Sequence, residues 1–267
     1  MKAGIAGIIV VVIAGVALFS FQHRLIFFPE VLPDGYVFSL PEGAEEVYFE
    51  ASDGARLHGI HYRQEEPGRG VILYFHGNAG SLRSWQTVAP IMLSTGYDLF
   101  LMDYRGFGKS RGRLSEKGLY ADGQAAYEVL RERGYGAEEI VILGRSIGTG
   151  IATEVARTRE SRGLILETPF TSLPDLAGEL MPWVPRFLVA YRFENLKKAG
   201  ELDVPVLVVH GDRDEVIPLR MGREVYEALD PGRREFVLLE GATHNDITGH
   251  PRYREGLRGF LEGLDEL

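Results

Sequence analysis

Cysteine is absent from this chain of 267 residues. Its absence excludes disulfide bonds, thiolate metal sites, a cysteine nucleophile and a lipidated cysteine. The spacings that bring histidine and acidic side chains together around a metal ion are also missing from the sequence. We therefore expect a protein that uses neither a metal nor another cofactor.

A basic cluster is lacking as well. Lys and Arg total 29 against 38 Asp and Glu, so the net charge is −9 and the isoelectric point is near 5.4. This balance argues against nucleic acid as a partner. Hydrophobic residues make up 45% and charged residues 25%, an ordinary globular composition that excludes collagen and disorder. Without repeats or low-complexity segments, the length fits one large domain.

Long hydrophobic runs are missing except at the N-terminus, where residues 3–21 form an uncharged run of 19. A helix of that length spans about 28 Å, close to the hydrocarbon thickness of a bilayer. The poor cleavage site around residues 17–21 favours an uncleaved membrane anchor over a cleaved signal peptide. We predict an anchor over residues 1–24 and a catalytic domain over residues 25–267, located at a membrane. The side of the membrane and the oligomeric state stay open.

The remaining sequence alternates between strand and helix patterns. Residues 46–50 and 56–62 flank a turn and predict an antiparallel hairpin. Short apolar runs, typical of parallel strands covered on both faces, follow at residues 71–75, 99–102, 140–143, 164–166, 206–209 and 236–239. Helical patterns separate them, as in a doubly wound, mostly parallel α/β sheet.

One stretch interrupts this alternation. Residues 168–200 contain four prolines between apolar helical pieces. This segment is too long for an ordinary strand-to-helix connection. We predict a small helical lid over the carboxyl edge of the sheet. Its apolar side chains suggest a substrate pocket, with ordinary lid packing as the alternative. The candidate pocket residues are Phe170, Met181, Trp183, Phe187 and Tyr191.

A G-x-S-x-G motif follows the strand predicted at residues 140–143. It places Ser146 between Gly144 and Gly148, directly before a helical pattern. A tight strand-to-helix turn of this kind lifts a serine hydroxyl above the sheet edge as a nucleophile. The alternative is a Gly-Ser turn whose serine has no catalytic role.

A serine nucleophile needs a base and an acid, which this architecture places later in the chain in the order acid, then histidine. Asp214 follows the strand at residues 206–209, and His244 follows the strand at residues 236–239. His244 would take the proton of Ser146, and Asp214 would hold the imidazole in place. On spacing alone, Asp212, Glu215 and Asp246 remain alternatives to Asp214.

A glycine-flanked loop after the strand at residues 71–75 predicts an oxyanion hole. The backbone N–H of Asn78, with Ala79 as second choice, would act together with the N–H of Ile147. The nearby G-K-S at residues 108–110 is not a phosphate-binding loop, because Asp103 stands where that motif needs glycine.

Several motifs together resemble the membrane-anchored serine hydrolases of the α/β-hydrolase superfamily. The matching stretches are residues 22–29 (QHRLIFFP), 75–80 (FHGNAG), 103–112 (DYRGFGKSRG), 143–148 (LGRSIG) and 243–246 (THND). The resemblance implies the α/β-hydrolase fold and a triad of Ser146, Asp214 and His244, which favours Asp214 over Asp212. It also implies activity on esters and thioesters, including removal of acyl chains from proteins.

These observations predict a membrane-anchored serine hydrolase for carboxylic esters or thioesters of small-molecule, acylated or lipid-like substrates. The alternatives are an acyl-protein thioesterase or a serine peptidase. A non-catalytic scaffold of the same fold is disfavoured, because Ser146, Asp214 and His244 are all present. A carboxylate nucleophile would be expected for an epoxide or haloalkane hydrolase, and position 146 is serine.

Overall fold

The computed structural model describes residues 15, 21–65 and 68–266. Most of the expected membrane anchor over residues 1–24 lies outside the described residues, which include only its positions 15 and 21–24. In the part of the chain that the structure describes, no helix combines the length and the apolarity needed to cross a bilayer.

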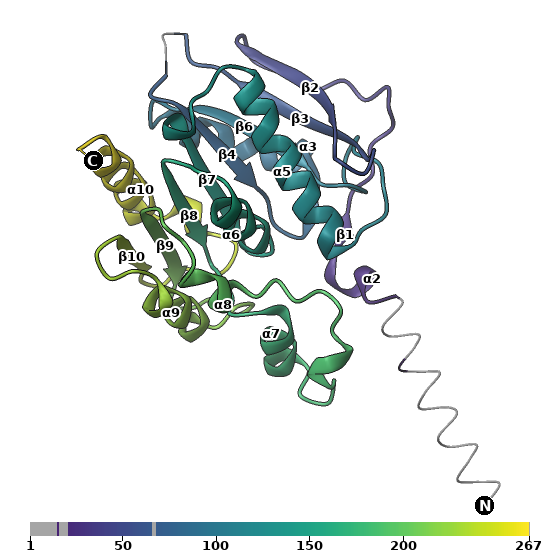
Figure 1. Ribbon diagram of the computed structural model, residues 1–267, viewed down its shortest axis with the longest axis vertical. Coiled ribbons are helices and arrows are strands. Elements are labelled where there is room, and N and C mark those ends of the chain that lie inside the picture. Colours follow the sequence, from purple (N-terminus) through teal and green to yellow (C-terminus); the bar gives the residue numbers. More distant parts are fainter. Residues whose placement is uncertain (1–14, 16–20, 66–67, 267) are drawn as a thin grey trace, which may run out of the picture.

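An eight-stranded sheet forms the centre of the molecule, in the order β10-β9-β8-β7-β4-β6-β3-β2 (Figure 1). Strand β3 runs antiparallel to both β2 and β6, and the other neighbouring strands pair in parallel. The bounds are β2 Ala44–Glu50, β3 Arg56–Tyr62, β4 Val71–Phe75, β6 Asp98–Asp103, β7 Ile140–Arg145, β8 Gly163–Glu167, β9 Val206–Gly211 and β10 Arg234–Leu239. The predicted mostly parallel sheet with an N-terminal hairpin is therefore confirmed.

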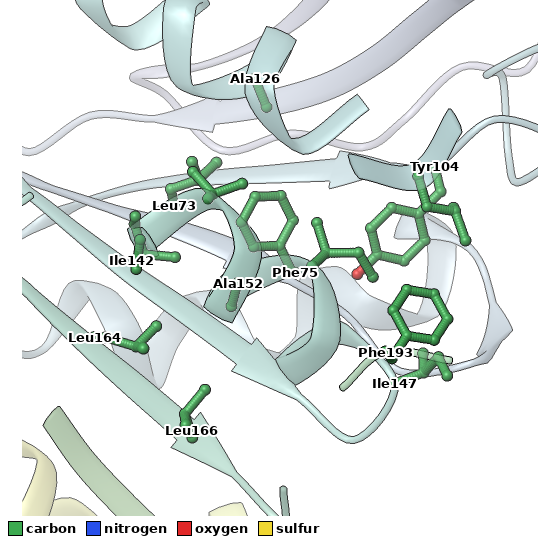
Figure 2. Packing of buried hydrophobic residues seen from close by; sticks show 14 of the residues in the cluster. Leu73, Phe75, Tyr104, Ala126, Ile142, Ile147, Ala152, Leu164, Leu166 and Phe193 are labelled. Carbon is green, nitrogen blue, oxygen red and sulfur yellow. The ribbon is translucent and has the colours of Figure 1, made fainter. Parts of the chain in front are cut away.

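Helices cover both faces of this sheet, so the central strands are apolar on both sides. In β4, Leu73 and Phe75 pack on the face covered by α5, α6 and α9, whereas Ile72 and Tyr74 pack on the face covered by α3, α4 and α10. Figure 2 shows side chains of the first of these layers, among them Ala126 of α5, Ala152 of α6 and Ile142 of β7. The helix bounds are α3 Leu82–Trp85, α4 Ala89–Leu93, α5 Glu116–Glu132, α6 Gly148–Thr158, α9 Leu219–Ala228 and α10 Pro251–Gly263, with 3-10 turns η1 Gln86–Val88, η2 Ala137–Glu139, η4 Ile247–Gly249 and η5 Leu264–Glu266.

A second, two-stranded sheet was not predicted from the sequence. It joins β1 (Phe28–Pro29) in parallel to β5 (Ala79–Gly80), and Phe28 pairs with Ala79. Helix α2 (His23–Ile26) precedes β1 directly. This pairing fastens the N-terminal segment to the loop that follows β4, where the sequence predicts the oxyanion hole.

The predicted lid, residues 168–200, divides into two parts. Helix α7 (Leu173–Leu180) and the 3-10 turn η3 (Arg186–Leu188) lie outside the helix layers, at the same end of the molecule as α2 (Figure 1). Helix α8 (Asn195–Ala199) instead packs against α6 and α9. Its Asn195 and Ala199 are buried, so this last part of the predicted lid belongs to the core.

Candidate active site

Ser146 occupies the sharp turn between β7 and α6. Its φ of 53° lies in the left-handed region, which residues with a side chain seldom adopt. The Ser146 N–H donates to the carbonyl of Glu167 at 2.9 Å, and the Ser146 carbonyl accepts the N–H of Thr149 at 3.0 Å. A strained backbone conformation that is held by surrounding hydrogen bonds is characteristic of functional positions.

The two glycines of the motif allow the strand and the helix to approach each other. A Cβ at Gly144 would lie 2.5 Å from the carbonyl oxygen of Gly148. A Cβ at Gly148 would lie 2.2 Å from the carbonyl oxygen of Phe75 in β4. Both distances are too short for non-bonded atoms, so the turn that presents Ser146 requires glycine at both positions.

The structure brings Ser146, His244 and Asp214 into one hydrogen-bonded row. His244 Nε2 lies 3.1 Å from Ser146 Oγ, and His244 Nδ1 lies 2.8 Å from Asp214 Oδ2. The three residues follow β7, β10 and β9, so they meet at the carboxyl edge of the parallel strands. With Nδ1–H donated to the carboxylate, Nε2 is free to accept the serine proton.

Asp214 is held as an anion. Its Oδ1 accepts the N–H groups of Val216 at 2.9 Å and Ile217 at 2.7 Å. Burial by itself raises the pKa of the carboxyl group, but the hydrogen bond and charge of His244 and these two N–H groups outweigh it. The net pKa of Asp214 is lowered.

The other candidate acids make different contacts. Asp212 accepts the Gly241 N–H at 2.6 Å, and Asp246 accepts the Thr243 N–H at 2.7 Å. Glu215 accepts the backbone N–H of His244 at 3.3 Å. None of these three carboxylates is hydrogen-bonded to the imidazole ring, so the tertiary structure separates Asp214 from the alternatives that spacing left open.

Two backbone donors face the same space as the serine. Asn78 and Ile147 border a cavity together with Ser146 and His244. Among the residues described, no backbone or side-chain acceptor takes the N–H of Asn78 or that of Ile147. Unengaged N–H groups next to a nucleophile are suited to bind a developing oxyanion.

The loop carrying Asn78 is fixed from several sides. Its side-chain Nδ2 donates to the Ile26 carbonyl at 2.9 Å, and Trp85 Nε1 donates to the Ala79 carbonyl at 2.8 Å. Below the loop, the buried ring of His76 stacks on Trp85 with centroids 5.6 Å apart. These contacts hold the N–H groups in place without using them.

The cavity above Ser146 has a volume of about 490 Å³ and a mostly apolar lining. Of the predicted pocket residues, Phe170 and Met181 line it. Tyr191 does not, because its ring is buried against Phe27 and Phe193. Trp183 and Phe187 do not line it either, and both residues are 78% exposed. The lining residues are Gln22, Leu25, Ile26, Phe28, Asn78, Ala79, Ser146, Ile147, Phe170, Leu173, Leu176, Ala177, Leu180, Met181, Val184, Leu188, Val189, Val216, His244 and Asn245.

One wall of the cavity was missed from the sequence. Gln22, Leu25, Ile26 and Phe28, from the segment just after the apolar run, border the cavity opposite the lid. The match of residues 22–29 to a motif was a signal for this segment, but it gave no indication of where the segment packs.

Arg145 was also missed, although it lies inside the G-x-S-x-G motif. Its buried Nη2 donates to the carbonyls of His244 at 3.1 Å and Asn245 at 3.3 Å. The guanidinium therefore holds the loop that carries the imidazole. A charged residue at the end of an otherwise apolar strand was the available signal.

No group of three or more His, Asp or Glu side chains that could hold a metal ion occurs within the described ranges. The groups that the arrangement itself presents are a hydroxyl that can act as a nucleophile, an imidazole that can act as a base and two backbone donors.

Comparisons with known proteins agree with this fold. A family model described as alpha/beta hydrolase fold matches residues 70–198. An uncharacterized protein of Mycobacterium tuberculosis is 34% identical over 248 residues, which cover 91% of this chain and 88% of that protein. Alpha/beta hydrolase domain-containing protein 17C of Mus musculus is 36% identical over 224 residues, covering 82% of this chain and 68% of that protein.

Among solved structures, an esterase from Pyrococcus furiosus superposes with a TM-score of 0.70 at 18% identity, covering 90% of this chain and 98% of that chain. An esterase from Rhodococcus superposes with a TM-score of 0.63 at 19% identity, covering 83% of this chain and 99% of that chain. At such low identity these likenesses show the fold alone.

Proposed function

Because this chain belongs to the alpha/beta hydrolase family, we propose that it is a serine hydrolase for carboxylic esters or thioesters of apolar acyl groups, acting through an acyl-enzyme. The observation that carries the proposal is the row of Ser146, His244 and Asp214, joined at 3.1 Å and 2.8 Å beside an apolar cavity. The esterases that share the fold support an ester as the bond that is cleaved.

In the first half-reaction, Ser146 Oγ attacks the acyl carbon while its proton passes to His244 Nε2. The carboxylate of Asp214 stabilises the imidazolium that forms. The carbonyl oxygen, now negatively charged, accepts hydrogen bonds from the N–H groups of Asn78 and Ile147. Collapse of this intermediate breaks the bond to the leaving group, which departs with the proton from His244 as an alcohol or thiol.

In the second half-reaction, water replaces the leaving group. His244 Nε2 takes a proton from the water as its oxygen attacks the acyl carbon of the ester on Ser146. The bond to Ser146 Oγ then breaks, and the proton returns from His244 to the serine. The acid product leaves and the free enzyme is restored.

The lining of the cavity supports an apolar acyl group as the part of the substrate that is bound. Helix α7 contributes Leu173, Leu176, Ala177 and Leu180, which share one face at helical spacing and border the cavity. Burying a methylene group contributes about 0.8 kcal/mol of binding free energy. An acyl chain of several carbons therefore gains more from this site than an acetyl group.

We also propose that residues 1–24 tether the enzyme to a membrane. The uncharged run of 19 residues supports this, because its length matches the bilayer interior. The charge balance supports it too. A chain of net charge −9 is not held to anionic lipid by electrostatic attraction, so its contact with a membrane would depend on the apolar segment.

The proposal is tested by replacing the nucleophile. We expect the full chain in mild detergent to hydrolyse p-nitrophenyl butyrate, and Ser146→Ala to lower kcat by at least about 10³-fold. A fluorophosphonate probe should label Ser146 in the wild-type protein, as read by peptide mass spectrometry. Ser94→Ala, which removes a hydroxyl bonded to the Ile91 carbonyl, is the matched control. Wild-type turnover by Ser146→Ala would refute the proposal.

A further inference from the structure

Exposed apolar side chains occur in the cavity lining and in the adjoining part of the lid. Leu25, Phe28 and Leu180 border the cavity and are nevertheless 60%, 57% and 51% exposed. Trp183 and Phe187, both largely exposed, directly precede the lining residues Val184 and Leu188 in the sequence, and Phe187 also borders a second, more polar hollow with Asp175 and Arg186. We call these five residues the apolar rim. Gathered apolar surface of this kind marks an interaction site rather than ordinary solvent-facing surface.

The apolar rim comes from two distant segments that are joined by hydrogen bonds. Gln22 Nε2 donates to the Leu188 carbonyl at 3.2 Å, and Gln22 Oε1 accepts the Ala190 N–H at 2.7 Å. The side chain thus connects the segment of α2 and β1 to the end of the lid. Figure 1 shows α2 and α7 at the same end of the molecule. The two segments that carry the rim are therefore fastened to each other beside the cavity.

This surface lies next to the apolar run of the sequence. The run ends at residue 21, and Gln22, the next residue, borders the cavity. One residue of chain spans less than about 4 Å. A membrane that holds residues 3–21 therefore cannot lie far from the cavity mouth.

The charges beside the rim suit a lipid surface. Segments 21–28 and 180–189 contain Arg24 and Arg186 and no acidic residue, although the chain carries a net charge of −9. Arg186 is paired with Asp175 at 2.8 Å. Arg24 has no acidic partner among the described residues. A cation at the border of an apolar surface, with an exposed tryptophan and phenylalanine nearby, is typical of contact with lipid headgroups and the acyl boundary.

From these observations we infer that the apolar rim is a membrane-docking surface, through which the acyl chain of a bilayer lipid passes to Ser146 without crossing water. The substrate class is then an acyl ester of a lipid that resides in the membrane. The inference rests on the proposed function, because it supplies the substrate of the same site. Leu25 and Phe28 belong both to the apolar rim and to the cavity wall, so apolar side chains lead from the exposed surface into the cavity.

Contact with lipid can be measured without any activity. The full chain is reconstituted into phosphatidylcholine vesicles with brominated or unbrominated acyl chains, and tryptophan fluorescence is recorded. We expect brominated lipid to quench the emission, and Trp183→Phe to lose most of the quenching. The second tryptophan, Trp85, is bonded to the Ala79 carbonyl behind the oxyanion loop and should stay unquenched. Equal emission in both vesicles would overturn the inference.

The route to Ser146 is tested by comparing two substrates on the full chain. One is 4-methylumbelliferyl palmitate embedded in the vesicles, and the other is a water-soluble butyrate ester. We expect the double variant Trp183→Ser/Phe187→Ser to lower the ratio of palmitate to butyrate turnover at least about fivefold. Val37→Ser should retain the wild-type ratio. Val37 is also highly exposed, and its neighbour Phe38 stacks on His58 of β3, away from the cavity lining.

The outcomes separate this inference from the proposed function. If butyrate is hydrolysed but lipid quenching is absent and the ratio does not change, the mouth faces water and only the inference fails. If neither ester is hydrolysed by the wild type, the proposed function fails, while quenching still decides whether the rim meets lipid. If quenching is absent and Trp183→Ser converts a dimer into a monomer in sedimentation, a second copy covers the rim and the inference is overturned.

Discussion

Asp214 differs from its acidic neighbours in the contacts of its two oxygens. Oδ2 faces His244 at 2.8 Å, while Oδ1 is occupied by two backbone N–H groups. This division leaves one oxygen to orient the imidazole and fixes the carboxylate so that it cannot rotate away. The lowered pKa of Asp214 keeps the group ionised wherever the enzyme is folded near neutral pH.

We therefore expect Asp214→Asn to lower kcat by about 10⁴-fold, because an amide favours the wrong tautomer of the imidazole. The measurement is steady-state hydrolysis of p-nitrophenyl butyrate. Asp212→Asn is the matched control, since Asp212 accepts only the Gly241 N–H, and it should change kcat by less than about tenfold. Equal losses in the two variants would contradict the role given to Asp214.

At the scale of the element, α7 decides what the cavity can hold. Its inward face carries Leu173, Leu176, Ala177 and Leu180, whereas Glu179 points to solvent and pairs with Arg220. Ala177 is the smallest of the inward residues. A larger side chain at this position would occupy volume that an acyl chain otherwise fills.

For a series of p-nitrophenyl esters we expect kcat/KM to rise about fourfold for each added methylene until the cavity is filled. In Ala177→Phe the preferred acyl chain becomes shorter, and activity on the longest chains falls about tenfold. Glu179→Ala on the outward face of the same helix should keep the wild-type preference. An unchanged series in Ala177→Phe would mean that acyl chains bind elsewhere.

At the scale of the whole molecule, three buried histidines make the fold sensitive to acid. Burial lowers the pKa values of His58, His61 and His210, that of His61 to about 4. For His61 the charges of Arg133 and Arg63 add to this effect. The unfolded chain binds protons at these histidines below about pH 6.5, whereas the folded chain binds them only at lower pH. The contribution of these histidines to the free energy of unfolding is therefore fully present above about pH 6.5 and decreases as the pH falls toward 4.

We expect His61 alone to lower the free energy of unfolding by about 3 kcal/mol between pH 7 and pH 4. Urea unfolding followed by circular dichroism at a series of pH values measures the effect. His61→Gln should flatten the pH dependence by that amount, and His23→Gln, which changes a partly exposed histidine, should leave it as in the wild type. Parallel pH curves for His61→Gln and the wild type would contradict the prediction.

Local patterns in the sequence determined the elements. Continuous apolar runs predicted the parallel strands, because strands covered on both faces have no polar side. Caps are equally local, since the hydroxyl of Ser115 accepts the N–H of Gly118 at 3.1 Å at the start of α5. Gly144 and Gly148 indicated a tight turn at Ser146, because local backbone geometry depends on the residues of the turn itself. The membrane anchor over residues 1–24 stays a prediction.

Contacts between distant residues were decided only by the tertiary structure. Spacing left Asp212, Glu215 and Asp246 open beside Asp214, because which carboxylate reaches His244 depends on the side-by-side placement of β9 and β10. The wall formed by α2 and β1 depends likewise on the pairing of β1 with β5. Periodicity reports which face of an element is apolar, but not which distant segment covers it. For that reason the sequence predicted an apolar lid, and only the fold showed which lid residues line the cavity and which are exposed to solvent.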